Sequence, residues 1–284
     1  MKEKYTTLYA IIILLLLLLL TIIPSSFFFP TSNGQQRLPV LLVHGYLNDK
    51  SVWNDWIEDL RAVGIFAEAV KFNGNDKCGS AADHAEQLRS IVEGFKIRAH
   101  SDTINIVAHS KGGLDARVYL ANNPSTDDVA NLIMVGTPNA GSPRADNRDR
   151  EEIVFANQIC EPFSDEAIND LREGAPATMV ENNLHTQYHT IAGDWKAFFD
   201  FCTPFPFSPV PFPCIPGDFD CIDTPAMVTY QVEGSIEING PDDGVVPLES
   251  VESGEFNSLD RTDNCHTNLF GNEEFNIAMS ILGQ

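Results

Sequence analysis

The sequence predicts an α/β protein with a doubly wound, mostly parallel sheet and helices on both faces of that sheet. Short, continuously apolar segments, which are typical of strands buried on both faces, alternate with segments of helical periodicity. The chain is 284 residues long and 43% hydrophobic, which is enough for one domain with such a sheet. The expected strands are 38–45, 65–71, 103–108 and 129–136.

Amphipathic segments between these strands predict helices. Residues 51–64 form the first helix, with Ser51 as its N-cap and Gly64 as its stop. Ser80 is expected to cap the second helix, and residues 114–123 form the third, which ends before a proline. The apolar faces of the first two helices carry Val52, Trp53, Trp56, Ile57 and Leu60, then Leu88, Ile91, Val92 and Phe95. Helices in this order connect parallel strands by right-handed crossovers.

The alternation of strands and helices becomes less regular after residue 138. We expect a short helix over 164–170, a strand over 188–193, a last strand over 235–238 and a final helix over 272–283. The length after the N-terminal segment suits one α/β domain with insertions or two small domains, and no internal repeat is visible; we take residues 38–284 as one domain.

An aromatic and proline-rich insertion interrupts this domain at residues 195–226. Its central stretch, "FCTPFPFSPVPFPC", combines phenylalanines with closely spaced prolines. Proline lacks the amide hydrogen that helices and central strands require, so neither structure is expected there.

The first 30 residues differ in character from the rest of the chain. Lys2 and Lys4 precede an uncharged apolar run over 8–23, as in a secretory signal. The run lies at the short edge of what a membrane-spanning helix needs, and no A-x-A cleavage site follows it. Residues 1–30 therefore predict export, either as a cleaved signal peptide or as a retained membrane anchor, with 31–37 as a linker. The protein is then secreted or anchored at the cell surface.

Charge excludes one class of partner. The chain holds 40 acidic and 18 basic residues, for a net charge of −22. Such a surface repels nucleic acid and anionic lipid, and it suits a salty medium that screens self-repulsion.

The cysteines are expected to form disulfides. The six cysteines stand at 78, 160, 202, 214, 221 and 265, and none forms a C-x-x-C pair. An even number in an exported chain predicts disulfides rather than a zinc or redox motif. We expect at least two bridges, one of them within the group Cys202, Cys214 and Cys221. The sequence leaves the connectivity open.

The stretch "IVAHSKGG" places a serine at the carboxyl end of a predicted strand. Ligands of α/β sheets bind at this end of the strands. A serine on a sharp strand-to-helix turn needs small residues two positions away on either side, and Ala108 and Gly112 flank Ser110 in this way. The turn exposes the serine hydroxyl, and the N–H of Lys111 opens the helix toward the same space. This pattern predicts a nucleophile.

A serine nucleophile needs a base and an orienting acid, which follow it in the order serine, acid, histidine in this type of fold. His266 is the histidine nearest the C-terminus, in a loop before the last helix. Asp242 and Asp243 precede it in "GPDDGVVP", and we prefer Asp243, because the turn at Gly244 aims its carboxylate. His84 and His100 fall in a helix before the serine, and His189 falls within a strand.

The segment "HGY" supplies a second donor for a developing oxyanion. Gly45 lets the backbone fold back, so that the N–H of Tyr46 faces the reacting carbonyl oxygen. His44 is expected to bond the loop rather than act as a base. His109 is expected to be packed and hydrogen-bonded, and the Lys111 side chain to be solvated.

Four motifs together resemble the bacterial triacylglycerol lipases and related esterases of the α/β-hydrolase superfamily. They are "LPVLLVHGY", "IVAHSKGGLDAR", "VGTPNAGS" and "DDGVVP", and the resemblance covers about 38–284 except the insertion. It implies an α/β-hydrolase fold and hydrolysis of lipid-like carboxylic esters. It also implies a catalytic set of Ser110, Asp243 and His266, with the Tyr46 and Lys111 amides as the oxyanion hole.

Several alternatives accompany this interpretation. An acyltransferase would use the same acyl-enzyme, and an inactive α/β-hydrolase domain could serve adhesion or binding. No cofactor is expected. Many of these lipases carry a calcium-binding aspartate after the catalytic histidine, and here Thr267 and Asn268 stand there. Asp218, Asp220 and Asp223 have the right chemistry for calcium, but a solvated acidic loop explains them as well.

The insertion offers a candidate acyl-binding surface. Phe205, Phe207 and Phe212 could receive the acyl chain of a lipid or small ester substrate on a flap near the site. A structural insert whose aromatic side chains pack against the domain is the competing interpretation.

Overall fold

The structure is a computed structural model, and it describes residues 37–74, 77–146, 164–195, 200–201, 213–214 and 240–283. The predicted signal segment, the strand predicted at 235–238 and nearly all of the insertion lie outside these residues. The same holds for Asp218, Asp220 and Asp223, and for Phe205, Phe207 and Phe212.

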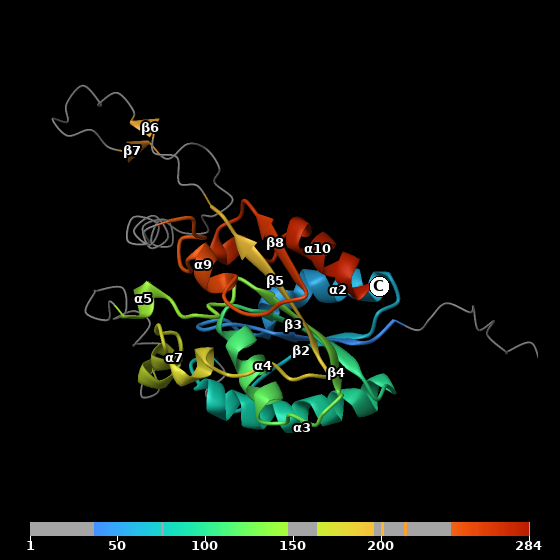
Figure 1. The fold of residues 1–284 in the computed structure, drawn as a ribbon. Coiled ribbons are helices and arrows are strands. Elements are labelled where there is room, and N and C mark those ends of the chain that lie inside the picture. The colour runs from blue at the N-terminus through green and yellow to red at the C-terminus, as the bar shows by residue number, and fades with distance from the viewer. Residues whose placement is uncertain are drawn as a thin grey trace, which may run out of the picture. The chain divides into compact units, whose positions relative to one another are not determined.

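A six-stranded parallel sheet forms the centre of the domain, in the order β2-β1-β3-β4-β5-β8 (Figure 1). The strands are β1 (Val40–Val43), β2 (Ala67–Ala69), β3 (Ile104–His109), β4 (Val129–Val135), β5 (Gln187–Gly193) and β8 (Ser258–Thr262). Val107 in β3 pairs with Leu42 of β1 and Ile133 of β4, so the strand that leads to Ser110 lies inside the sheet.

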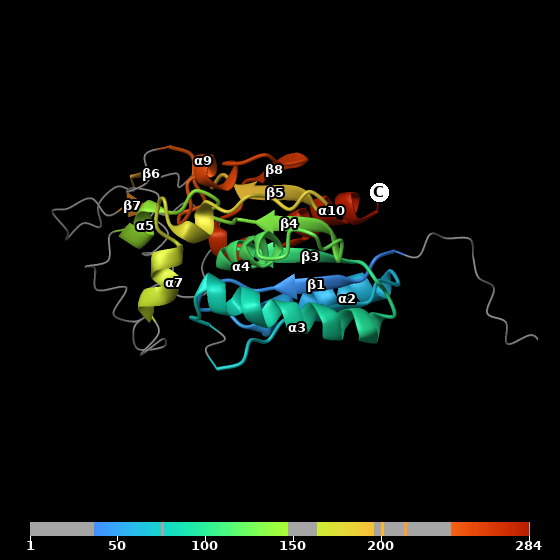
Figure 2. The ribbon, with the colours of Figure 1, turned by 60° about the horizontal axis from the view of Figure 1, so that its bottom comes forward.

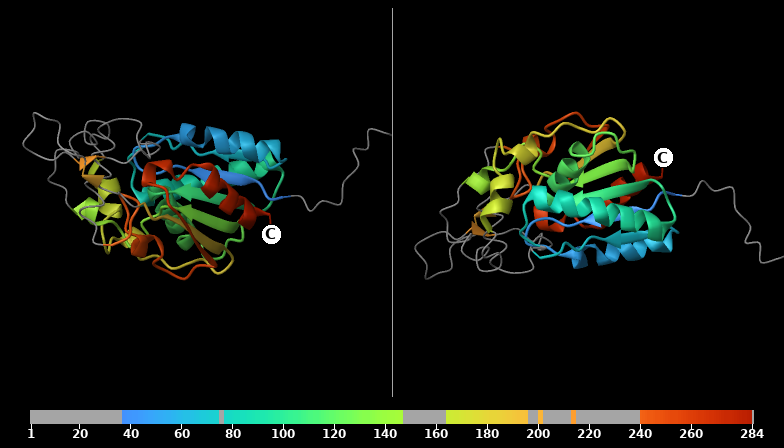
Figure 3. Two further views of the ribbon diagram at one scale, coloured as in Figure 1. Left: turned by 90° about the horizontal axis from the view of Figure 1, so that it is seen from above. Right: turned by 90° about the horizontal axis from the view of Figure 1, so that it is seen from below.

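Helices cover both faces of the sheet, as predicted. α3 (Ala81–Ala99) and α4 (Lys111–Ala121) lie on one face, and α2 (Asn54–Ala62) and α10 (Asn272–Leu282) lie on the other (Figures 1 and 3). The side chains of β3 are buried on both faces of the sheet. Ile104, Ile106 and Ala108 pack into the cluster under α3 and α4, whereas Val107 packs into the cluster under α2 and α10. Alternate side chains of one strand thus support two cores.

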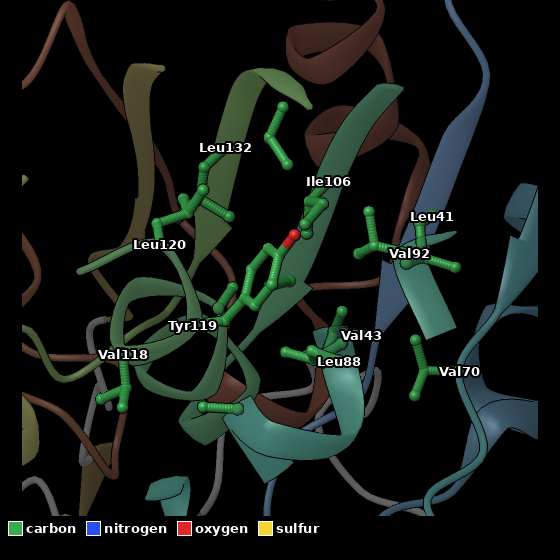
Figure 4. Close-up of a cluster of buried hydrophobic side chains, with 14 of the residues drawn as sticks. Leu41, Val43, Val70, Leu88, Val92, Ile106, Val118, Tyr119, Leu120 and Leu132 are labelled. Carbon is green, nitrogen blue, oxygen red and sulfur yellow. The ribbon is translucent and has the colours of Figure 1, made fainter. Parts of the chain in front are cut away.

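The cluster under α3 and α4 surrounds Tyr119, whose ring lies among aliphatic side chains of the sheet and of α3 (Figure 4). Leu88 and Val92 of α3 and Ile106 of β3 are fully buried there. Burial of each such side chain contributes about 1.5–3 kcal/mol, so this packing holds α4 against the sheet directly behind Ser110.

The remaining elements are short. They are η2 (Lys50–Trp53), α5 (Pro143–Asp146), α7 (Ser164–Asp170), η3 (Pro176–Thr178), α9 (Leu248–Val251), η5 (His266–Asn268) and an antiparallel pair, β6 (Asp200–Phe201) and β7 (Pro213–Cys214). Figure 2 shows α5, α7 and α9 at the end of the sheet toward which the strands point. This end carries the residues predicted to act on a substrate.

The predicted helix caps have mixed outcomes. Ser80 caps α3 as expected, since its Oγ accepts the Asp83 N–H at 3.1 Å. The prediction of Ser51 as a cap is wrong. Asp49 caps the preceding turn, and its carboxylate accepts the Ser51 N–H at 3.0 Å. Gly64 has a φ of 82° directly after α2, which agrees with its predicted role as a stop.

Three strands were not expected from the sequence, namely β6 and β7 in the insertion and β8 in the main sheet. β8 (Ser258–Thr262) pairs with β5 at the edge of the sheet, and Leu259, the most apolar residue in it, is 52% exposed. Its sequence, SLDRT, has no apolar run, because an edge strand with an open face does not need one.

Cys78 and Cys265 are both disulfide-bonded, and no cysteine in the described part of the chain is free. The bridge predicted among Cys202, Cys214 and Cys221 concerns side chains outside the described ones and stays a prediction. Within the described ranges, no helix has both the length and the apolar character that crossing a membrane requires. The predicted anchor over 8–23 lies outside those ranges.

Candidate active site

Ser110 occupies a strained turn between β3 and α4. Its backbone has φ 54° and ψ −129°, a conformation that L-residues rarely adopt. Gly112 permits this turn, because a Cβ there would lie 2.5 Å from the carbonyl oxygen of His44. Gly45 is equally constrained, since its Cβ would lie 2.8 Å from the Cβ of Ser110. The two glycines let the loop after β1 approach the serine closely.

A chain of hydrogen bonds joins Ser110, His266 and Asp243. The Ser110 Oγ lies 2.9 Å from His266 Nε2, and His266 Nδ1 lies 2.7 Å from Asp243 Oδ2. A carboxylate only accepts, so Nδ1–H donates to Asp243 and Nε2 accepts the serine hydroxyl hydrogen. This tautomer leaves a lone pair of His266 directed at the serine, as a general base requires.

Asp243 is held by its own turn. Its Oδ1 accepts the N–H groups of Val245 at 3.0 Å and Val246 at 2.7 Å, and Gly244 between them has a φ of 89°. The neighbouring Asp242 instead caps the turn by accepting the Gly244 N–H at 2.6 Å. The structure thus brings Asp243 rather than Asp242 to His266.

The backbone also joins the acid to the histidine. The His266 N–H donates to the Asp243 carbonyl at 2.9 Å. Gly193, at the end of β5, allows this approach, because a Cβ there would lie 2.3 Å from the Asn264 carbonyl and 2.8 Å from Asp243 Cβ. These contacts come from residues far apart in the sequence, and the sequence patterns give no sign of them.

His109 connects the serine strand to the histidine loop. Its Nε2–H donates to the His266 carbonyl at 3.0 Å, and the two rings lie 4.8 Å apart. Burial, together with the neighbouring His266 and His44, lowers the pKa of His109 well below its ordinary value, so this imidazole stays neutral. His109 is packed as predicted. We expected both of its ring nitrogens to be hydrogen-bonded, but only Nε2 is, because the buried Nδ1 has no partner.

The two predicted oxyanion donors belong to the two segments that adjoin Ser110. Lys111 is the first residue of α4, and Tyr46 follows Gly45 in the loop that touches Ser110. The His44 side chain contacts the same loop as predicted, with its Nδ1 3.1 Å from the Gly45 carbonyl oxygen. First-turn amides of a helix lack carbonyl partners within the helix, which leaves them to bind an anion.

The prediction of a solvated Lys111 side chain is wrong. This side chain is buried, and its Nζ lies 2.5 Å from Asp115 Oδ1. The other oxygen of Asp115 lies 2.7 Å from His84 Nδ1 on α3. The i,i+4 spacing of Lys111 and Asp115 on a predicted helix could have indicated the ion pair. No pattern in the sequence indicates that His84 joins it.

Metal ligands do not gather in the described part of the chain: no group of three His, Cys, Asp or Glu side chains there could hold an ion. The acidic residues considered for calcium lie outside it.

The fold and the arrangement around Ser110 define the α/β-hydrolase class. A model of the palmitoyl protein thioesterase family matches residues 39–196, more than half of the chain, and the chain belongs to that family. This result agrees with the resemblance to lipases and esterases found in the sequence.

Individual relatives point the same way. Triacylglycerol lipases of Pseudarthrobacter phenanthrenivorans and Burkholderia plantarii are each 30% identical to the chain over 116 residues. The match covers 39% of this chain but only 36% and 32% of those lipases, about a third of their length. The mature lipase BlEst2 of Bacillus licheniformis has the same fold, with a TM-score of 0.67 and 22% identity over 87% of this chain and 92% of that one.

Proposed function

We propose that this protein is an exported serine hydrolase that cleaves carboxylic esters with lipid-like acyl chains. The observation that supports this most strongly is the continuous hydrogen bonding from Asp243 through His266 to Ser110. The family and its lipase relatives support the reaction class. Their names also recommend triacylglycerols and palmitoyl thioesters as substrates to test.

The reaction proceeds through an acyl-enzyme in two halves. Ser110 Oγ attacks the ester carbonyl carbon while His266 Nε2 takes the hydroxyl proton, and Asp243 stabilises the resulting imidazolium. The carbonyl oxygen becomes an oxyanion that accepts hydrogen bonds from the Tyr46 and Lys111 amides. The bond to the alcohol oxygen then breaks, and His266 returns the proton to this leaving group.

The second half repeats the same chemistry with water. His266 takes a proton from a water molecule, whose oxygen attacks the acyl carbon bound to Ser110. Collapse of the second oxyanion breaks the bond to Ser110 Oγ, which regains its proton from His266. The products are a carboxylic acid and free Ser110.

A panel of p-nitrophenyl esters from acetyl to palmitoyl tests this proposal, with a fluorophosphonate probe alongside. We expect turnover of the esters, together with labelling at Ser110. A protein that neither turns over any ester nor reacts with the probe would be an inactive binding domain. Transfer of the acyl group to added glycerol, at the expense of free acid, would instead identify an acyltransferase.

The reaction we propose needs no cofactor, since every step uses a side chain or amide of this chain. EDTA should therefore leave the turnover of a short ester unchanged. Loss of activity with EDTA and its recovery with Ca²⁺ would instead show that the protein needs an ion, for which Asp218, Asp220 and Asp223 are the candidate ligands.

The phenylalanines of the insertion are our candidates for the acyl-chain site. Each methylene removed from water contributes about 0.8 kcal/mol, so an acyl-binding flap favours long chains increasingly with length. Changing Phe205, Phe207 and Phe212 together to serine should reduce kcat/KM for octanoyl esters far more than for acetyl esters. Equal losses with a lower Tm would assign these residues to structural packing.

Export rests on the composition of residues 1–30. Fractionation of the producing cells, with N-terminal sequencing of the protein recovered, tests it. We expect the protein in the medium or on the outer surface of the membrane, and the sequencing distinguishes a cleaved signal from a retained anchor. Recovery of the protein, with its cysteines reduced, from the cytosol alone would contradict this part of the proposal.

A further inference from the structure

A second buried group of polar side chains lies next to Ser110 and takes no part in the proton transfers. It consists of Lys111 and Asp115 on α4 and His84 on α3, and each of the three is at most 3% exposed. Lys111 Nζ lies 2.5 Å from one oxygen of Asp115, and His84 Nδ1 lies 2.7 Å from the other. We refer to these three residues as the buried cluster.

The buried cluster connects the two oxyanion donors. It begins at the side chain of Lys111, whose own amide is one donor. At its other end the His84 ring stacks on Phe72 at 3.8 Å, and Phe72 meets the His44 ring edge-on at 5.7 Å. His44 directly precedes Gly45 and Tyr46, which carries the second donor. A continuous series of contacts thus runs behind the serine from one donor to the other.

The start of α4 needs such support, because it lacks the usual one. An N-cap side chain accepts a hydrogen bond from the second or third amide of a helix, but Ser110 at the N-cap position makes no capping hydrogen bond, and its hydroxyl contacts His266 instead. The link from Lys111 to Asp115 spans the first turn from the side and leaves the Lys111 amide to the oxyanion.

Stability alone does not explain a buried ion pair. Removing a lysine and an aspartate from water is costly, and an apolar pair of similar size is often as stable. A lysine in the first turn of a helix also opposes the helix dipole. Burial raises the pKa of Asp115, but Lys111 and the His84 hydrogen bond outweigh this and lower it, so the charges remain paired. Compared with an apolar pair of similar size, the Lys111–Asp115 ion pair additionally holds the two side chains in a defined orientation.

We propose that the buried cluster is a set of positioning residues that fixes the Lys111 and Tyr46 amides around the oxyanion. This inference rests on the proposed ester hydrolysis. It predicts that breaking the cluster weakens transition-state binding and leaves substrate binding nearly unchanged.

The test uses Lys111→Met, Asp115→Asn and the double variant Lys111→Met/Asp115→Leu in the full chain. Kinetics with p-nitrophenyl octanoate give kcat and KM, with active sites counted by complete reaction with a fluorophosphonate. Counting sites removes unfolded protein from the comparison. We expect kcat to fall about 10- to 100-fold, less than or comparable to the loss of a whole oxyanion donor, with KM within about twofold of wild type.

The double variant separates positioning from stability, because it leaves no unpaired buried charge. We expect its Tm to return toward that of wild type while kcat per active site stays low. The affinity for a trifluoromethyl ketone, which forms an oxyanion adduct with the serine, should fall in parallel with kcat/KM. Recovery of both kcat and ketone affinity in the double variant would overturn the inference.

Lys96 and Asp128 provide a matched control. Lys96 lies near the other end of α3, and its Nζ pairs with Asp128 just before β4. Lys96→Met should lower Tm without changing kcat per active site. An equal fall of kcat in this control would contradict a role specific to the buried cluster.

A wild-type protein inert toward every ester and the phosphonate would overturn the proposed function, and this inference with it. An active wild type whose cluster variants keep full kcat would overturn the inference alone.

Discussion

Two buried carboxylate–imidazole pairs are connected to the Ser110 turn, and they differ in their third member. Asp243 with His266 and Asp115 with His84 each have a nitrogen–oxygen distance of 2.7 Å, and all four side chains are almost fully buried. The third group is the hydroxyl of Ser110 in the first pair and the ammonium of Lys111 in the second. In the mechanism that we propose, the same contact therefore serves proton transfer in the first pair, whereas in the second it holds a buried charge.

The nucleophile itself gives the largest expected effect. Ser110→Ala removes the group that only the first pair serves, and kcat should fall on the order of 10⁶-fold. Alanine is small enough for the turn, so Tm should stay close to that of wild type. Turnover above about a tenth of wild type would show that Ser110 is not the nucleophile.

The acid of the first pair comes next. Asp243→Asn removes the partner of the His266 imidazolium and should reduce kcat on the order of 10⁴-fold. Asp242→Asn is the matched control, because an asparagine oxygen can still accept the Gly244 N–H. Stopped-flow or steady-state assays of both variants should rank them in this order, and the reverse ranking would move the acid to Asp242.

The same substitution in the second pair should act mainly on stability. Asp115→Asn leaves the Lys111 ammonium buried without a counter-charge, which should lower the free energy of unfolding by about 3–5 kcal/mol. Denaturant unfolding of Asp115→Asn and Asp243→Asn, measured side by side, gives the comparison. A smaller loss of stability in Asp115→Asn than in Asp243→Asn would remove the distinction between the pairs.

His109 has no carboxylate in contact, and it gives the smallest effect. Its pKa is lowered in the folded protein, so below about pH 6.5 the unfolded chain binds a proton that the folded chain does not. The free energy of unfolding should therefore fall as the pH drops below about 6.5, by at most about 1.4 kcal/mol per pH unit from this residue. His109→Gln should flatten this slope, whereas His185→Gln, at an exposed position, should not. Equal slopes in wild type and His109→Gln would contradict the prediction.

The sequence predicts the regions where chemistry and packing leave a local pattern. The apolar runs at β1, β3 and β4 identify the parallel sheet, and the spacing around Ser110 identifies its turn. Asp243 could be preferred over Asp242 because the glycine after it marks the turn. Each of these features depends on neighbours within a few residues.

Features that depend on distant neighbours were missed. β8 carries no apolar run, because one of its faces is open, and no pattern in the sequence indicates that His84 joins the ion pair of Lys111 and Asp115. Ser51 and Asp49 are both good capping residues, and which of them caps is decided by where the turn after β1 ends. The roles of the insertion and of residues 1–30 lie outside the described residues and remain predictions.

The edge position of β8 has a consequence for how the protein loses activity as it unfolds. Ser110 is fixed in the middle of the sheet, between β1 and β4, whereas His266 follows an edge strand whose outward side chains are exposed. Edge strands with few buried contacts open at lower free energy than central ones. Local unfolding of this margin would separate the histidine from the serine while most of the sheet stays intact. We therefore expect heat or mild denaturant to abolish activity before the domain unfolds. Activity should return on cooling as long as the sheet has stayed folded.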